Sequence, residues 1–227
     1  MTDFLQVYAG LKAVLFDMDG VLTSNSPFHE AAWKDVVQHY FQVQIEDGDT
    51  RIHGGRAHEI LTVLLGRQVT QEEALDFHEH KEARYRELAQ GNIQPLEGLH
   101  AYLNFLTSKG IEPVLVTSGG IPNVALVLDA FGLQETFKLR ITGETVKNGK
   151  PHPEPYLTAL QKLGITAQQA LVHEDAPAGV RSGRDAGCRV IALETTTGAA
   201  ELYALGAELV VQNFDQLLER LQTPQEV

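Results

Sequence analysis

The sequence of 227 residues contains one cysteine, one tryptophan and two methionines. With a single cysteine, Cys188, no intrachain disulfide can form, and its place in an apolar segment predicts a small buried residue. Lys and Arg total 18 against 30 Asp and Glu, which gives a formal net charge of −12. Because nucleic acids and anionic membranes favour clustered Lys and Arg, this charge argues against both as partners.

The first ten residues have neither a basic start nor a long apolar stretch. They therefore resemble neither a signal peptide nor a membrane anchor, and we expect a cytoplasmic protein. We also expect a monomer, with a weak dimer as the alternative. Because the net charge is negative, any anionic substrate must be held by local features such as a metal ion, a lysine or backbone amides.

Short apolar strands alternate with helical segments over most of the chain, which predicts an α/β fold with a doubly wound parallel sheet and helices on both faces. Strands are predicted at 11–17, 114–117, 139–141, 170–173, 190–193 and 209–211, and helices at 122–131, 153–163, 178–186, 199–205 and 215–221.

A block of helical patterns interrupts this alternation after the first strand. Apolar residues recur at helical spacing within 28–41 and 58–65, and 71–89 is polar and helix-prone. We therefore expect an inserted helical cap domain at residues 25–95 and a core domain made of residues 1–24 and 96–227. The turn-rich segments 24–27 and 91–98 are the expected hinges.

Two acids follow the first predicted strand, in Phe16-Asp17-Met18-Asp19-Gly20. Strand alternation would point Asp17 and Asp19 to opposite faces, so the chain must leave strand geometry at Met18–Gly20 if both face one site. Two close carboxylates repel each other, and the pair is best explained by a hard cation such as Mg²⁺. An acidic turn without a ligand is the alternative.

Polar residues also gather in three later segments. Thr117-Ser118-Gly119-Gly120 and Glu174-Asp175 each end a predicted strand, and Lys150 lies in a turn-rich approach to a helix. Open parallel sheets bind ligands outside the carboxyl ends of their strands, so we expect all these segments to meet there. Alternatively, Ser118–Gly120 could form only a turn, and Glu174 and Asp175 could cap the next helix.

In this order, the four segments resemble the motifs of the haloacid dehalogenase-like phosphatase superfamily, and most closely its branch of sugar-phosphate phosphatases and β-phosphoglucomutase. The resemblance implies a Rossmann-type core with a small helical cap. It places the nucleophile at Asp17 and the general acid and base at Asp19. It also implies phosphate binding by Thr117, Ser118, Gly119 and Lys150, and Mg²⁺ binding by Asp17, Asp19 through its carbonyl, Asp175, and Glu174 either directly or through water.

The resemblance leaves two activities open, because a mutase must also hold a second phosphate. Mutases of this branch hold the second phosphate with polar and basic side chains just after the second motif and with an arginine of the cap. This chain has Gly119 and Gly120 after that motif, and Arg56 lies one residue away from the position of the cap arginine. We therefore expect a Mg²⁺-dependent phosphatase that hydrolyses a small sugar or polyol phosphate through an aspartyl-phosphate, with a β-phosphoglucomutase-like mutase as the alternative. An inactive binding protein on the same fold would be expected to lack one of the motif residues, and none is missing.

The cap segments contain three polar candidates for substrate contact, His29, His53 and Arg56, for which exposure to solvent is the alternative. His29 stands twelve residues after Asp17, in a segment that resembles the start of the mutase cap. Trp33 is expected to pack inside the cap rather than stack on a ligand.

Overall fold

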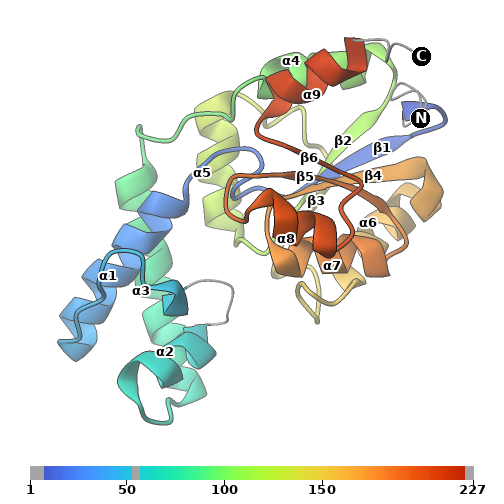
Figure 1. Cartoon of the computed structure of the whole chain (residues 1–227). Helices are drawn as coiled ribbons and strands as arrows, with labels where there is room; N and C mark the ends of the chain where they lie inside the picture. Colours follow the sequence, from blue (N-terminus) through green and yellow to red (C-terminus); the bar gives the residue numbers. More distant parts are fainter. Residues whose placement is uncertain (1–7, 53–56, 223–227) are drawn as a thin grey trace. The chain divides into compact units, whose positions relative to one another are not determined.

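The computed structural model describes residues 8–52 and 57–222 of the chain. The chain forms two compact units (Figure 1). One is the continuous segment Asn25–Ile93, and the other is made of the segments before and after it.

The second of these units is built on one sheet of six parallel strands, in the order β3-β2-β1-β4-β5-β6. The predicted α/β fold with a parallel sheet is confirmed. The strands are β1 (Ala13–Phe16), β2 (Glu112–Val116), β3 (Arg140–Ile141), β4 (Ala170–Glu174), β5 (Arg189–Leu193) and β6 (Leu209–Val211). Central strand β1 pairs with β2 and β4, so that Phe16 lies between Leu115 and His173. Every residue of β1 and β4 is buried, as expected for strands covered on both faces.

Helices cover both faces of this sheet. The helices are α4 (Leu99–Ser108), α5 (Ile121–Phe131), α6 (Glu154–Leu163), α7 (Pro177–Asp185), α8 (Ala199–Ala204) and α9 (Phe214–Gln222), with a 3₁₀ turn, η3, at Ala167–Gln169. Helices α6, α7 and α8 lie on one face, and α4 and α9 lie together on the other (Figure 1). Helix α4 is absent from the predicted elements, although its buried residues Leu99, Tyr102, Leu103 and Leu106 follow helical spacing.

The two faces differ in what they bury. The face under α6–α8 holds an aliphatic core that includes Leu15, Val172 and Val190. The face under α4 and α9 is aromatic. There the Phe16 ring lies 6.0 Å from the Tyr102 ring, and the Tyr102 ring lies 4.9 Å from the Phe214 ring. His173 is fully buried in this aromatic layer, 5.1 Å from Phe16.

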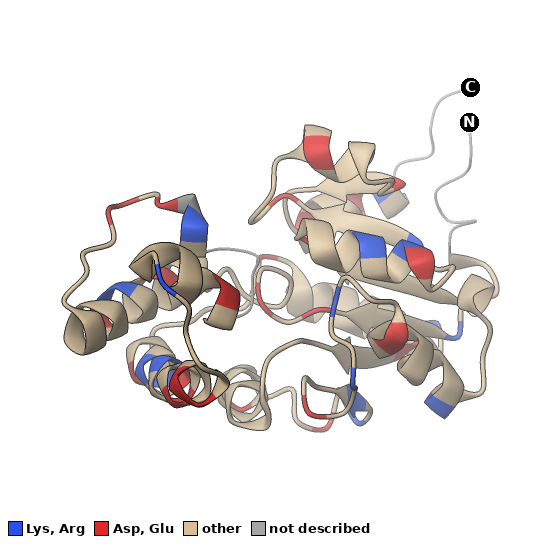
Figure 2. Cartoon of the chain, turned by 90° about the horizontal axis from the view of Figure 1, so that it is seen from below, with Lys and Arg blue, Asp and Glu red and all other residues tan. Residues whose placement is uncertain are grey.

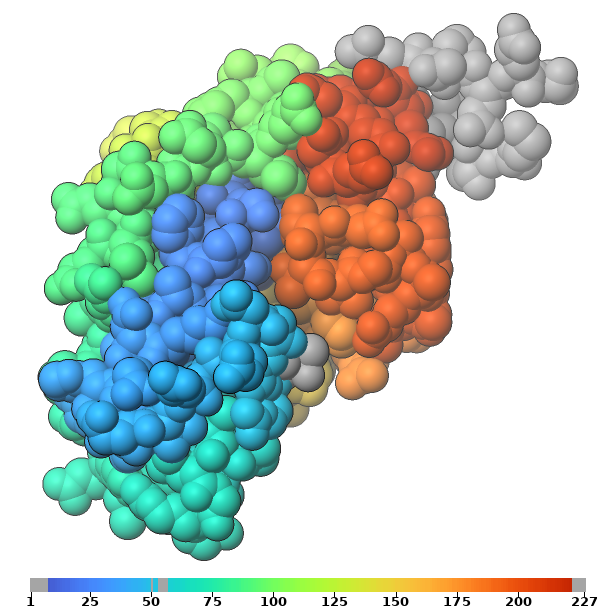
Figure 3. All heavy atoms as spheres, turned by 60° about the vertical axis from the view of Figure 1, so that its left-hand side comes forward, coloured from blue at the N-terminus to red at the C-terminus, as the bar shows by residue number. Residues whose placement is uncertain are grey.

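The unit Asn25–Ile93 is helical, with α1 (Ser26–Phe41), α2 (Ala57–Leu65), α3 (Gln71–Ala89) and a 3₁₀ turn, η2 (Thr50–Ile52). The bounds of α3 are those predicted. Thr70 caps α3 by accepting a hydrogen bond from the Glu73 amide. Trp33 is buried and packs 4.9 Å from Phe77, as predicted. Helix α3 packs against both α1 and α2, and the atoms of these helices, coloured blue to green, lie side by side in the space-filling view (Figure 3).

Charges are mixed on the surface of the described residues. Figure 2 shows Lys and Arg lying among Asp and Glu across the elements in view, rather than in one continuous stripe. None of the helices in the described part of the chain combines the length and apolarity needed to cross a membrane.

Candidate active site

The loop after β1 carries the first two acids. Asp17 follows the strand directly, and its amide donates to the carbonyl of His173 in β4 at 3.0 Å. The chain then turns, because the Leu22 amide donates to the carbonyl of Met18 at 2.8 Å. Gly20 takes a φ of +78°, which a residue with a side chain rarely adopts. The chain thus leaves strand geometry within Met18–Gly20.

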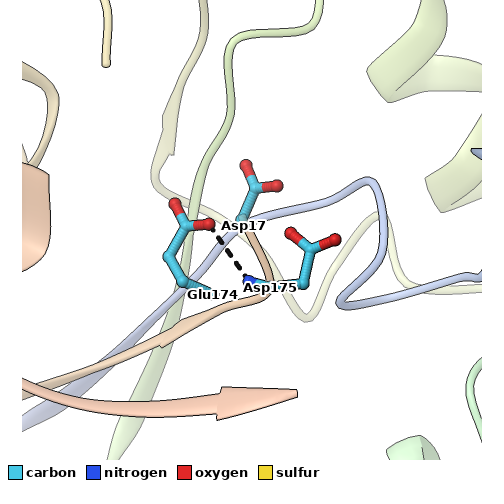
Figure 4. A group of neighbouring side chains, drawn as sticks. All are labelled: Asp17, Glu174 and Asp175. Atoms are coloured by element: carbon cyan, nitrogen blue, oxygen red, sulfur yellow. Dashed lines mark hydrogen bonds between the residues drawn. The ribbon is translucent and has the colours of Figure 1, made fainter. Parts of the chain in front are cut away.

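Three carboxylates meet at the carboxyl ends of β1 and β4. Asp17, Glu174 and Asp175 each offer an oxygen, and these oxygens lie within 4.8 Å of one another. Figure 4 shows all three side chains pointing to the same side of the strands. The three residues are nearly inaccessible to solvent, at 8%, 1% and 3% exposure. Asp19 lies partly buried in the turn after β1, and its carboxylate is not one of these three.

Lys150 ties two of the acids together. Its Nζ lies 2.6 Å from Oδ1 of Asp17 and 2.7 Å from Oε1 of Glu174. The same Nζ donates to the carbonyl of Val116, the last residue of β2, at 2.8 Å. One buried ammonium therefore contacts groups at the ends of three neighbouring strands, which is where the sequence analysis expected the motifs to meet.

Glu174 has further partners that the sequence did not suggest. The Tyr156 hydroxyl of α6 donates to its Oε1 at 2.5 Å, and the Asp175 amide donates to its Oε2 at 3.3 Å. A Cβ at position 179 would come within 2.0 Å of the Glu174 carboxylate, so Gly179 is what permits α7 to approach. Helix α7 has Ala176 at its N-cap and no side-chain cap bond, so neither acid caps it.

Asp175 is enclosed by the Gly20 turn. A Cβ on Gly20 would lie 1.9 Å from Oδ2 of Asp175. The Thr195 hydroxyl donates to the Gly20 carbonyl at 2.6 Å and lies 3.4 Å from the same Oδ2. The Asp175 carboxylate and the turn after Asp17 are therefore packed against each other.

Burial and mutual repulsion set the protonation of the cluster. Burial raises the pKa of Asp17 well above its usual value; Lys150 opposes this shift, and the neighbouring acids add to it. Burial, and then Glu174, raises the pKa of Asp175 to about 7. Burial acts to lower the pKa of Lys150, but Asp17 and Glu174 outweigh it and raise that pKa, so Lys150 stays charged.

The segment after β2 is held by one hydrogen bond to β3 and one within the segment itself. Thr117 is buried, its amide donates to Ile141 at 2.9 Å, and its Oγ1 accepts from the Gly119 amide at 3.0 Å. Ser118 is exposed. Gly120 then forms the N-cap of α5. Thr117 thus lies beside the end of β1, and Ser118 and Gly119 form the turn that leads into the helix.

In the helical unit, His29 of α1 lies in a polar cluster. Its Nδ1 is 2.8 Å from Nζ of Lys81 in α3, and its ring stacks on Tyr85 at 3.7 Å. Lys81 is only 6% exposed, and its burial could not be predicted because it lies in a run of polar residues. The other two cap candidates, His53 and Arg56, lie outside the described residues.

The comparisons with known proteins agree with this geometry. The model of the haloacid dehalogenase-like (HAD) hydrolases matches residues 11–187. The chain belongs to this family. Hexitol phosphatase A of Escherichia coli is 35% identical over 208 residues, which cover 91% of this chain and 93% of that protein. A β-phosphoglucomutase of Mycobacterium tuberculosis is 28% identical over 242 aligned positions, covering 92% of each. The predicted family is confirmed.

A solved structure shows the same fold as this HAD hydrolase. The crystal structure of a HAD hydrolase, family IA, variant 3, from Entamoeba histolytica aligns with a TM-score of 0.85 and 26% identity, and covers 93% of this chain and 98% of that one.

The three-acid cluster has the chemistry of a divalent-cation site. It offers oxygen donors only, as hard cations prefer. Burial is the main reason that the pKa of Asp17 is raised, and the neighbouring acids add to it, so a bound cation would offset negative charge that is held out of water. Tyr156, Lys150 and an amide already contact both oxygens of Glu174. Asp17 and Asp175 are therefore the carboxylates better placed to bind a cation directly.

Proposed function

We propose that this HAD hydrolase is a Mg²⁺-dependent phosphatase that hydrolyses a small sugar or polyol phosphate through an aspartyl-phosphate on Asp17. The observation that carries the proposal is the contact of Lys150 Nζ with Asp17, at 2.6 Å, inside the three-acid cluster. A buried lysine beside a buried carboxylate can hold a phosphate next to a nucleophile. The name of the E. coli relative supports the substrate class.

The reaction takes two steps, transfer of the phosphoryl group to Asp17 and its hydrolysis from Asp17. An oxygen of Asp17 attacks phosphorus, the bond from phosphorus to the alcohol oxygen breaks, and Asp19 gives its proton to the leaving alkoxide. Water then attacks the phosphoryl group, Asp19 takes a proton from this water, and inorganic phosphate leaves Asp17 ionised. Lys150 and Thr117 hold the phosphate oxygens. Mg²⁺, held by Asp17, the Asp19 carbonyl and Asp175, would offset the negative charge of phosphate and acids.

The helical unit Asn25–Ile93 is proposed to act as the cap that sets substrate choice. Within it, His29 is the described candidate for substrate contact, because Lys81 and Tyr85 hold its ring in one orientation. His53 and Arg56 are further candidates from the sequence alone.

The mutase is the second candidate. It is favoured by the similarity to a β-phosphoglucomutase, which is 28% identical and covers 92% of the chain. Against it, Gly119 and Gly120 supply no side chain for a second phosphate. Incubation with β-glucose 1-phosphate and a catalytic amount of the 1,6-bisphosphate separates the two activities. We expect inorganic phosphate to appear faster than glucose 6-phosphate. Rapid glucose 6-phosphate formation with little phosphate release would establish the mutase instead.

A panel of phosphorylated sugars and polyols, assayed by phosphate release, tests the phosphatase and its substrate class. The metal is tested on the best substrate, with Mg²⁺ as activator and a chelator or Ca²⁺ as inhibitor. Ca²⁺ accepts more ligands than Mg²⁺ and is expected to bind both oxygens of Asp17, which would prevent attack. Full activity in metal-free buffer would contradict the proposed cation site.

A further inference from the structure

A chain of buried polar groups lies on the aromatic face of the sheet and takes no part in the reaction above. The Tyr102 hydroxyl of α4 is 2.7 Å from Nε2 of His173 and 2.7 Å from the Tyr8 hydroxyl. Nδ1 of His173 is 3.1 Å from the carbonyl oxygen of Ile191 in β5. Tyr102 and His173 are 0% exposed and Tyr8 is 8% exposed. The chain of contacts runs from α4 through β4 to β5.

The directions of these hydrogen bonds follow from their chemistry. A carbonyl only accepts, so in the neutral ring Nδ1 of His173 carries the proton and Nε2 is an acceptor. Tyr102 must then donate to Nε2, and its oxygen accepts from Tyr8. Each polar side-chain atom of these three residues thus has a partner. Burying them still costs free energy, because three polar side chains leave water for a layer otherwise filled by rings such as Phe16 and Phe214. Apolar side chains would fill the same space without that cost.

His173 is the last residue of β4 that pairs with β1, next to the acids that both strands carry. Its carbonyl accepts the Asp17 amide at 3.0 Å, and its Cα pairs with that of Phe16. The next two residues are Glu174 and Asp175. A shift of His173 therefore changes the position of Asp17 relative to Asp175. Catalytic groups tolerate displacements of only about 0.5 Å, and an error of about 1 Å can cost on the order of 100-fold in rate.

We infer that Tyr102 and His173 are positioning residues, whose hydrogen bond fixes the separation of Asp17 from Asp175 at the ends of β1 and β4. The inference rests on the proposed function, because it assigns a role in that reaction. Without the Tyr102 hydroxyl, Nε2 of His173 lacks a donor in an apolar layer, and a movement of the ring toward another donor would act on the end of β4 that carries it.

The test compares Tyr102→Phe with Tyr8→Phe as the matched control. Each variant loses one buried tyrosine hydroxyl of the same hydrogen-bonded chain, but Tyr8→Phe leaves the Tyr102–His173 bond intact. The measurements are kcat and KM on the best substrate of the panel, the Mg²⁺ dissociation constant by calorimetry without substrate, and urea unfolding.

We expect both variants to lower the unfolding midpoint, and Tyr102→Phe to lower it more, because it breaks two buried hydrogen bonds where Tyr8→Phe breaks one. Only Tyr102→Phe is expected to lower kcat, by about tenfold, with KM little changed, and to weaken Mg²⁺ binding several-fold. Equal kcat and equal Mg²⁺ affinity in the two variants would overturn the inference and leave the pair with a role in stability alone.

A second pair of variants covers the case in which Tyr102→Phe does not fold. His173→Gln keeps an acceptor that Tyr102 can reach, whereas His173→Leu removes it. We expect the glutamine variant to retain more of the wild-type kcat and Mg²⁺ affinity than the leucine variant, and equal values would contradict the inference.

The calorimetric readout separates this inference from the proposed function. If the wild type releases no phosphate from any substrate of the panel, the proposed phosphatase fails. Mg²⁺ affinity still decides the positioning role in that case, because unequal affinities of the Tyr102→Phe and Tyr8→Phe proteins support it and equal affinities refute it.

Discussion

Tyr102 and Tyr156 hold consecutive residues of β4 from opposite faces of the sheet. The Tyr102 hydroxyl is 2.7 Å from Nε2 of His173, and the Tyr156 hydroxyl is 2.5 Å from Oε1 of Glu174. Successive side chains of a strand point to opposite faces, so one tyrosine comes from the aromatic layer under α4 and the other from the aliphatic core under α6. The end of β4 that presents Glu174 and Asp175 is therefore held on both sides.

Removal of the Tyr156 hydroxyl should loosen the three-acid cluster. In Tyr156→Phe, Glu174 loses a hydrogen bond to a charged acceptor, and we expect a loss of about 1–3 kcal/mol in the free energy of unfolding, measured in urea. Turnover should also fall, because Glu174 shares its Oε1 with Lys150. Tyr203→Phe is the control, since that tyrosine is 48% exposed and its hydroxyl only accepts from the Val210 amide at 3.2 Å. Equal stability of the two variants would contradict a role for the Tyr156 hydroxyl.

Asp17→Asn should abolish turnover and leave the fold intact. An amide has nearly the shape of a carboxylate but is a poor nucleophile, so we expect phosphate release to fall more than ~1000-fold, about 4 kcal/mol in barrier height. The control is Asp129→Asn, an exposed carboxylate of α5 in the same unit, which should keep wild-type activity. Circular dichroism checks the fold. Residual activity within about tenfold of wild type would rule out the covalent mechanism.

The Gly20 turn should tolerate no side chain. Gly20 has a φ of +78°, and a Cβ there would lie 1.9 Å from Oδ2 of Asp175. Gly10 has a φ of +80° with nothing within 4 Å of the same position, so Gly10→Ala reports backbone strain alone. We expect Gly10→Ala to lose about 1 kcal/mol of stability from backbone strain. Gly20→Ala should lose more, because the Asp175 carboxylate must also move, and it alone should lose Mg²⁺ binding, measured by calorimetry. Retained Mg²⁺ affinity in Gly20→Ala would show that Asp175 can move at little cost.

Cys188 should make stability fall at alkaline pH. Burial raises the pKa of its thiol from 9.0 to about 12, so between these values the unfolded chain loses a proton that the folded chain keeps. The thiol's contribution to stability is thus complete below pH 9 and decreases as the pH rises. From pH 8 to pH 10 we expect the wild type to lose about 1 kcal/mol more than Cys188→Ala, measured by urea unfolding. Parallel pH profiles of the two proteins would contradict this.

The parts of the fold that could be predicted are those set by local patterns. The apolar runs that became β1 and β4 and the capped segment Gln71–Ala89 required only their own residues. Helix α4 has apolar residues at helical spacing, but it follows a turn-rich segment directly, and this obscured its start.

Some residues of the candidate site could be predicted from local patterns, and others could not. The acids at strand ends and the lysine in the turn before α6 could be predicted to converge, because parallel strands align their carboxyl ends. Tyr102 and Tyr156 could not, since they are 71 and 18 residues from their partners in β4, and nothing in a helix sequence marks a buried hydroxyl that donates across the packing interface. His29 was predicted as a candidate, but its partner Lys81, 52 residues away, was not, for the same reason.

The place of the insertion bears on how the chain folds. Strand β1 must pair with β2, and nearly a hundred residues separate them. The two sides of the insertion are tied within the sheet unit, where the Thr23 hydroxyl donates to Gln94 at 2.7 Å and the Leu96 amide to Leu22 at 2.8 Å. If the helices of Asn25–Ile93 fold first, the loop that must close between β1 and β2 becomes roughly threefold to fourfold shorter. The entropic part of the free-energy cost of closing this loop then falls by about 1 kcal/mol. A helical segment with no part in the sheet would then speed the assembly of the sheet.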